Sequence, residues 1–157
     1  LAWLKAYELT SDRAYLNRSR AIFDDLVSRS WSNASCGGGV CWQASQDPAN
    51  MKACYKNAIT NELFLTHAAQ LALVYQTLCS KVGGTSSRSD PIGECDSYTY
   101  TRRWAATTGA WMVESGMING SFLVNDGLDT FTNHESVCLN NRHTAYTYNQ
   151  GVILSGF

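Results

Sequence analysis

Apolar residues recur at helical spacing in three separate stretches of the chain. Residues 12–28 carry a one-sided apolar pattern, which predicts an amphipathic outer helix with Tyr15, Leu16, Ile22, Phe23, Leu26 and Val27 on its packed side. Residues 57–78 are apolar on most sides, which is typical of a buried inner helix. Residues 98–115 are again amphipathic, and Gly116 is well placed to end that helix.

The remaining segments predict two helix ends and three long loops. Residues 1–8 form the end of a helix, and Ser11 or Asp12 can cap the helix that follows. Residues 147–157 begin another inner helix. The long loops are expected at residues 29–56, at the Gly/Ser-rich residues 80–97, and over most of residues 120–146.

This order contains an internal repeat of one apolar helix followed by one amphipathic helix. The segment AYELT…YL…AIFDDL resembles LALVY…YTYTRRWAATTGAW. Repeated pairs of this kind predict an all-α toroid of helical hairpins, with the long loops gathered at one end of the inner helices. About two and a half hairpins are present, fewer than a closed ring needs. We therefore expect residues 1–157 to be part of a larger domain.

The amino-acid composition and charge of the chain argue against a nucleic-acid partner and a membrane span. The chain has 157 residues, a formal net charge of −1 and 45% hydrophobic residues, which suits one globular unit. It has no basic stripe that would neutralise the phosphates of a nucleic acid. No apolar run reaches the roughly 18 residues that are needed to cross a membrane.

Six cysteines and three Asn-x-Ser sequons, at Asn17, Asn33 and Asn119, predict a secreted, oxidised and glycosylated protein. A metal site is not expected, because no Cys-x-x-Cys motif is present and the three histidines are not spaced as ligand pairs. Sequence alone does not fix the disulfide pairing. Short loops favour Cys41 with Cys54 and Cys79 with Cys95, which leaves Cys36 with Cys138.

The stretch from residue 36 to residue 73 combines features that rarely occur together. A triple glycine lies between Cys36 and Cys41 and is followed by Trp42, and a polar cluster then leads into the buried helix. Glycine permits close approach of backbone to backbone or to a ligand. The stretch is either one wall of a polar pocket or a disulfide-pinned surface loop followed by a core helix.

Four segments, CGGGVCW, YKNAITNELFL, GMINGSFLVNDGLD and TYNQGVIL, resemble glycoside hydrolase family 76, the endo-α-1,6-mannanase family. The resemblance covers almost the whole chain in the same order, and it implies a six-hairpin (α/α) barrel. In this family CGGG is usually followed by an apolar residue and two tryptophans. Here Cys41 replaces the first of these tryptophans, and the additional cysteines resemble the eukaryotic branch.

The resemblance implies retaining hydrolysis of α-1,6-mannan by two neighbouring aspartates, without a cofactor. Retention requires two carboxyl groups about 5–5.5 Å apart. In the family this pair precedes a helix that ends like LAWLKAYELT, so it is expected upstream of Leu1, and no catalytic residue is assigned here. Asp24 and Asp25 are interpreted as surface acids, because successive helical residues do not share a face.

The resemblance and the polar pattern together suggest a set of substrate-binding residues. Trp42 either stacks on a sugar ring or packs beside a disulfide. Asn57 and Asn61 either take sugar hydroxyls or serve the helix start, where Asn57 or Thr60 is a possible cap. Glu62 orients a catalytic group, favours the helix N-terminus, or pairs with Lys56.

A second set of candidates lies further along the chain. Asp126 and Asp129 either contact sugar hydroxyls or stabilise the turn around Gly127. The last helix begins with Tyr148, Asn149 and Gln150. Like the Asn57–Glu62 segment, these residues are polar candidates for sugar contacts at the start of an inner helix. His67 is interpreted as a core histidine, whereas His134 and His143 are loop residues with no assigned partner.

Three functions therefore remain open for the whole protein. The first is an endo-acting α-1,6-mannan hydrolase, and a close variant is a transglycosylase that moves cell-wall glycans. Another is a mannan-binding protein without catalysis, and the last is a secreted structural protein. Each implies a secreted or cell-wall location, and the oligomeric state is left open.

Overall fold

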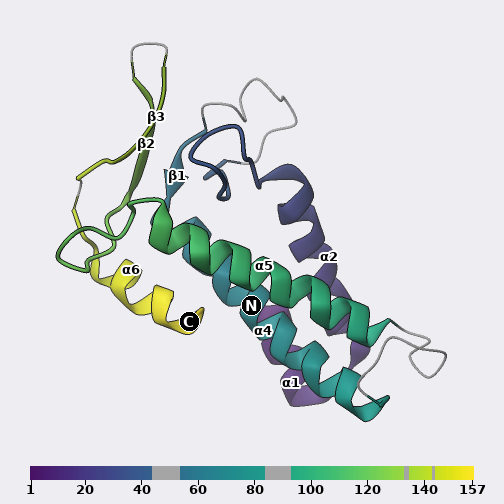
Figure 1. The fold of residues 1–157 in the computed structure, drawn as a ribbon. Helices are drawn as coiled ribbons and strands as arrows, with labels where there is room; N and C mark the ends of the chain where they lie inside the picture. Colours follow the sequence, from purple (N-terminus) through teal and green to yellow (C-terminus); the bar gives the residue numbers. More distant parts are fainter. Residues whose placement is uncertain (44–53, 84–92, 133–134, 143) are drawn as a thin grey trace.

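The structure is a computed structural model that describes residues 1–43, 54–83, 93–132, 135–142 and 144–157. Two helical hairpins and one further helix form most of it (Figure 1). The helices, in chain order, are α1 (Ala2–Thr10), α2 (Arg13–Arg29), α4 (Ala58–Lys81), α5 (Glu94–Glu114), α6 (Thr147–Val152) and the 3-10 turn η1 (Ile153–Ser155). This arrangement of paired helices confirms the predicted repeat.

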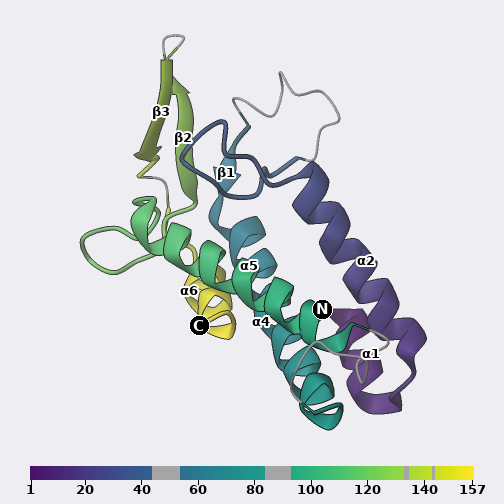
Figure 2. The ribbon, with the colours of Figure 1, turned by 45° about the vertical axis from the view of Figure 1, so that its right-hand side comes forward.

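Helix α4 is the centre of the structure, with α1 and α2 to one side and α6 to the other (Figure 2). One core cluster joins Leu16 and Phe23 of α2 to Phe64 of α4, and a second joins Leu65 of α4 to Met112 of α5. The expected burial of α4 on nearly all sides is wrong. Leu63 and Leu73 are 41% and 63% exposed, because the described elements cover only the other sides of α4.

The helix ends follow local chemistry. The Asp12 carboxylate accepts a hydrogen bond from the Ala14 N–H at 2.9 Å and caps α2, as expected. Gly116 has a φ of +83° directly after α5, which confirms its role in ending that helix. Helix α5 begins at Glu94 rather than at residue 98. Glu94 and Asp96 favour the early start, because negative charge stabilises the first turn of a helix.

The structure has three short strands, and two of them interrupt the loop expected over residues 120–146. Strands β1 (Lys56–Asn57), β2 (Gly127–Thr132) and β3 (Glu135–Asn140) form an antiparallel sheet in that order. Asn57 pairs with Gly127, so β1 places the β2–β3 hairpin beside the first turn of α4. The prediction of mostly loop for residues 120–146 missed strands β2 and β3.

The structure contains three disulfides, Cys36–Cys138, Cys41–Cys54 and Cys79–Cys95, and these are the expected pairings. The first joins the glycine loop to β3 across 102 positions of sequence. The other two each close one of the predicted loops. None of the described helices is both long enough and apolar enough to cross a bilayer.

Candidate functional site

The glycine loop, residues 36–42, lies directly on an indole ring of α5. A Cβ on Gly39 would lie 2.5 Å from Cζ2 of Trp111, and Gly39 also has a φ of +90°. Only glycine tolerates both conditions. The Trp111 Nε1–H donates to the carbonyl of Cys36 at 2.8 Å and fixes the start of the loop. The predicted close approach of backbone is confirmed.

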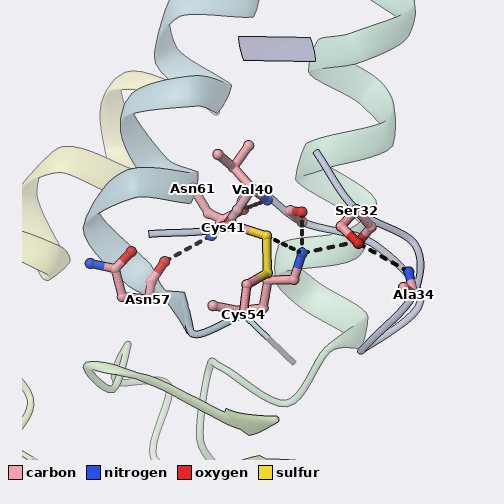
Figure 3. The surroundings of a disulfide bond; sticks show 9 residues. Ser32, Ala34, Val40, Cys41, Cys54, Asn57 and Asn61 are labelled. Carbon is pink, nitrogen blue, oxygen red and sulfur yellow. Dashed lines mark hydrogen bonds between the residues drawn. A yellow bond between two sulfur atoms is a disulfide. The ribbon is translucent and has the colours of Figure 1, made fainter. Parts of the chain in front are cut away.

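Asn61 anchors the end of the glycine loop (Figure 3). Its Oδ1 accepts from the Val40 N–H at 2.7 Å, and its Nδ2 donates to the carbonyls of Val40 at 3.0 Å and of Asn57 at 2.8 Å. The side chain is fully buried. The expectation that Asn61 contacts sugar directly is therefore wrong, because the main chain occupies its amide. Asn61 positions the loop instead.

Lys56 binds main-chain carbonyl groups of the glycine loop and of the segment before it. Its side chain is fully buried, and its Nζ donates to the carbonyls of Ser32 at 3.0 Å and of Gly39 at 2.5 Å. Burial lowers the pKa of Lys56 to about 8. The suggested pairing of Lys56 with Glu62 is wrong, because the ammonium group binds these loop carbonyls.

Gln150 repeats this anchoring arrangement on a second loop, residues 117–126. Its Oε1 accepts from the Val124 N–H at 2.9 Å, and its Nε2 donates to the Val124 carbonyl at 2.8 Å and to the Tyr146 carbonyl at 3.0 Å. Each anchored valine also forms an isolated β-bridge, Val40 with Trp31 and Val124 with Ile118. The predicted sugar contact of Gln150 is replaced by a positioning role, for the same reason as at Asn61.

Trp42 is one of the candidate residues that remain open to solvent, with 58% of it exposed. Its ring contacts the Tyr55 ring edge-on, with 6.4 Å between the ring centroids. The Tyr55 O–H donates to Asp126 Oδ2 at 2.5 Å and accepts from Asn141 Nδ2 at 2.8 Å. Burial, followed by the Asp126 carboxylate, raises the pKa of Tyr55. Trp42, Tyr55 and Asp126 therefore form one connected surface.

Tyr148 continues this surface from α6. It is 47% exposed and its ring stacks on Tyr146 with centroids 5.1 Å apart. Desolvation, then the negative charges of Asp126 and Glu62, raise the pKa of Tyr148. Asp126 and Glu62 therefore act electrostatically on Tyr148, and the roles of all three in substrate binding stay predictions. We call Trp42, Tyr55, Asp126, Tyr146 and Tyr148 the aromatic–acidic face.

Buried polar groups without partners accompany this face. Among the described residues, both Glu62 oxygens, the Asn57 side-chain oxygen and both side-chain polar atoms of Asn149 have no hydrogen-bond partner. Burial raises the pKa of Glu62 to about 8, so its carboxyl group is mostly protonated at neutral pH. Buried polar groups usually find partners, so these groups are candidates for contacts with a ligand.

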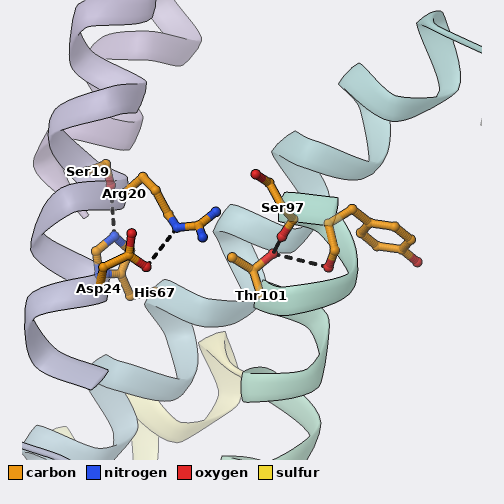
Figure 4. Close-up of polar contacts among 7 residues, drawn as sticks. Ser19, Arg20, Asp24, His67, Ser97 and Thr101 are labelled. Carbon is orange, nitrogen blue, oxygen red and sulfur yellow. Dashed lines mark hydrogen bonds and ion pairs between the residues drawn. The ribbon is translucent and has the colours of Figure 1, made fainter. Parts of the chain in front are cut away.

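Other candidates have different surroundings. His67 is buried and its Nε2 lies 2.8 Å from the Ser19 hydroxyl (Figure 4), which confirms the core histidine. Asp24 pairs with Arg20 at 2.8 Å and Asp25 with Arg29 at 2.5 Å, as expected of surface acids. Asp129 is exposed on β2. His134 and His143 lie outside the described residues.

The predicted sequons differ in their surroundings. Asn17 and Asn33 are exposed, whereas the Asn119 amide is engaged within its loop. Its Oδ1 accepts from the backbone of Ser121 and Leu123, and its Nδ2 donates to Asn125 at 2.8 Å. Glycosylation at all three positions stays a prediction. Within the described part of the chain, no group of three or more His, Cys, Asp or Glu side chains is arranged to hold a metal ion.

Sequence reasoning missed Tyr146 and Asn141, and it noted Tyr55 only as part of a polar cluster. Tyr146 and Tyr148 alternate in the sequence, and this pattern offered a signal for a paired aromatic surface. Tyr55 follows Cys54 and carried no such signal, because its role depends on Asp126 and Asn141. These partners lie beside it only through β1 and β2.

The paired helices, the anchored loops and the aromatic–acidic face together define a glycosidase-like (α/α) toroid. The chain matches the model of glycosyl hydrolase family 76 over residues 1–78 and 95–157, and it belongs to this family.

Curated relatives agree with this assignment. The chain is 30% identical, over 144 residues, to mannan endo-1,6-alpha-mannosidase DCW1 of Saccharomyces cerevisiae and equally to that of Candida glabrata. Each match covers 90% of this chain but 26% of the relative, so the chain spans about a quarter of these relatives.

A solved structure supports the fold. The α-1,6-mannanase of a Salegentibacter species superposes with a TM-score of 0.66 at 24% identity, covering 98% of this chain and 36% of the other. That structure is an inactive variant, with two consecutive aspartates replaced by alanine, in complex with α-1,6-mannotetrose. The fold is therefore that of the family 76 toroid.

Proposed function

We propose that the protein containing this chain is a retaining endo-α-1,6-mannanase, and that residues 1–157 form part of its (α/α) barrel. Family membership supports this reaction class. The single observation that carries the role of this chain is the aromatic–acidic face beside the first turn of α4. Stacked aromatic rings and carboxylates suit a sugar polymer, which offers apolar faces and hydroxyl donors.

Four residues of the face have a role in this proposal. Trp42 and Tyr148 supply ring surfaces for mannose units, and Asp126 accepts hydrogen bonds from hydroxyl groups. Tyr55 holds Asp126 in place through its O–H. The protonated Glu62, together with Asn57 and Asn149, supplies buried donors and acceptors to the sugar unit that reaches deepest. The catalytic aspartate pair is expected elsewhere in the protein, because Asp24 and Asp25 pair with arginines on α2.

We also propose that the protein is secreted and functions at or near a cell wall. The three disulfides favour an oxidising compartment, and polymeric mannan is an extracellular substrate.

The test is hydrolysis of linear α-1,6-mannan by the full-length protein, with analysis of product length and anomeric configuration. Short products that retain the α-configuration are expected. Asp126→Asn is expected to raise KM about tenfold or more, since a hydrogen bond to a charged group is worth about 1.5–3 kcal/mol. Tyr148→Ala is expected to raise KM as well, because it removes a ring surface on which a sugar stacks. Asp24→Asn is the matched control, and its kinetics are expected to equal those of the wild type.

The assay also separates the alternatives. Products longer than the substrate, formed when a mannooligosaccharide acceptor is added, would show a transglycosylase. Binding of mannan without turnover would show a binding protein. Unchanged KM in both face variants would refute the role that we assign to this face, even if the protein hydrolyses mannan.

A further inference from the structure

A second surface, on the opposite side of the glycine loop, has the chemistry of a carbohydrate site and no role in the proposed cleft. It is a hollow of about 550 Å³ between the end of α2, the glycine loop and the outer side of α5. This volume lies within the usual range for ligand sites. The rings of Trp31, Tyr100, Trp104 and Trp111 line it.

These rings are held rigidly. Trp31 contacts Trp104 edge-on with centroids 5.0 Å apart, and Trp111 donates its indole N–H to the Cys36 carbonyl. The rim adds polar groups, and Arg103, Thr107 and Glu114 are all exposed on α5. Rigid aromatic faces with a polar rim suit a pyranose ring, which has apolar C–H faces and hydroxyl edges.

The occupant is indicated by Asn33, which lines the same hollow and begins the sequon Asn33-Ala34-Ser35. Its Oδ1 accepts from the Trp31 Nε1–H at 2.8 Å. That contact orients the amide against the tryptophan and leaves Nδ2, the atom that takes a glycan, without a partner among the described residues. We propose that Asn33 carries an N-linked glycan whose first sugars lie in this hollow against Trp31 and Trp104.

The modification forms a bond from Asn33 Nδ2 to the anomeric carbon of the first sugar. It breaks that carbon's bond to the diphosphate of a lipid-linked oligosaccharide donor, and it releases the lipid diphosphate and one amide proton. The Trp31–Asn33 hydrogen bond survives, because it uses only Oδ1. The proposal rests on the proposed secretion of the protein but not on mannan hydrolysis.

The timing of folding is compatible with this modification. Ser35 is buried in the folded chain, so the sequon must be read before the loop closes. Cys36 is fixed by Cys138, which follows 102 positions later, so the start of the loop beside the sequon is not covalently fixed while that part of the chain is being synthesised. Asn119 differs, because its own amide organises its loop.

The experiment uses the full-length protein secreted from a glycosylating eukaryotic host. Glycopeptide mass spectrometry reports occupancy at each sequon, and peptide N-glycosidase is then applied to native and to denatured protein. We expect Asn33 to be occupied and its glycan to be released about tenfold more slowly than that of Asn17 under native conditions, a ratio corresponding to about 1.4 kcal/mol of protection. Asn17 is the internal reference because it is exposed on α2, and denaturation should abolish the difference. If Asn17 is not occupied, the denatured protein supplies the reference rate.

Two variants on α5 sharpen the test. Arg103→Ala with Thr107→Ala removes polar partners from the rim and should accelerate native release at Asn33. Arg102→Ala is the matched control, because it is an equally exposed neighbour that does not line the hollow. An unoccupied Asn33, or a glycan released equally fast from native and denatured protein, would overturn the proposal. Mannanase activity is measured separately, so either hypothesis can fail alone.

Discussion

The anchoring of the glycine loop by Asn61 makes a quantitative prediction. Asn61→Ala removes three hydrogen bonds from a fully buried site, two to Val40 and one to Asn57. At about 1 kcal/mol net for each bond, the loss is about 3 kcal/mol. The buried N–H and carbonyl of Val40 add to this if no water reaches them, and the better helix propensity of alanine returns about 0.5 kcal/mol.

The assay is urea unfolding of the full-length protein, comparing variants at constant m-value. Gln150→Ala removes the equivalent bonds at a half-buried site, so we expect a smaller loss of about 1–2 kcal/mol. Asn17→Ala is an exposed control and should change little.

Asn61→Asp tests the geometry more stringently. The aspartate keeps an acceptor for the Val40 N–H but turns its second oxygen toward two carbonyls that formerly received a donor. Repulsion and burial raise the pKa of the new carboxyl group in the folded state. The folded state then binds an additional proton, so the variant should recover stability as the pH falls below about 6. A loss under about 1 kcal/mol for Asn61→Ala, or an aspartate variant as stable as the wild type at pH 8, would refute the reasoning.

Three further predictions follow from other contacts. Gly39→Ala should lower the unfolding free energy by about 3 kcal/mol or more, since its Cβ would meet the Trp111 ring. Gly37→Ala should lower it by only about 1–2 kcal/mol, because Gly37 lies in open space at a φ of +65°. Equal losses in thermal unfolding would contradict this. The pKa of Glu62 is about 8 in the folded state against 4.5 in the unfolded state, so the fold loses at most about 5 kcal/mol of stability as the pH rises from 4.5 to 8. Glu62→Gln should flatten the dependence of the unfolding free energy on pH in that range. An unchanged slope would count against a buried carboxyl group. Replacing Cys36 and Cys138 together by serine should lower stability by about 2–5 kcal/mol, because the bond closes a loop of 102 positions, and an unchanged midpoint in denaturant would exclude that constraint.

Helical periodicity predicted the helices well where apolar residues set the pattern. Helix α2 was found within one residue at each end because Asp12 and the apolar stripe agree. The start of α5 was missed because the residues from Glu94 to Ser97 are mostly polar. Their acidic first turn and the disulfide of Cys95 to Cys79 hold that turn in place.

The sequence singled out several residues of the candidate site but did not predict what their side chains contact. Asn61 and Gln150 were recognised as important amides, but sequence does not say whether an amide faces solvent or a neighbouring main chain. The position of the β2–β3 hairpin was missed because its pairing with β1 is long-range. Without that hairpin, the contact between Tyr55 and Asp126 had no basis.

The side-chain amides of Asn61 and Gln150 allow the sequences of the two loops to vary. Asn61 and Gln150 hold only main-chain atoms of Val40 and Val124, so they are indifferent to most side chains at the crests of the two loops. Exposed positions in and beside the two loops, such as Ala34 and Leu123, can therefore be substituted while both loops stay docked. Substitutions at such positions can change the surface of the loops without changing the packing of the helices beneath them.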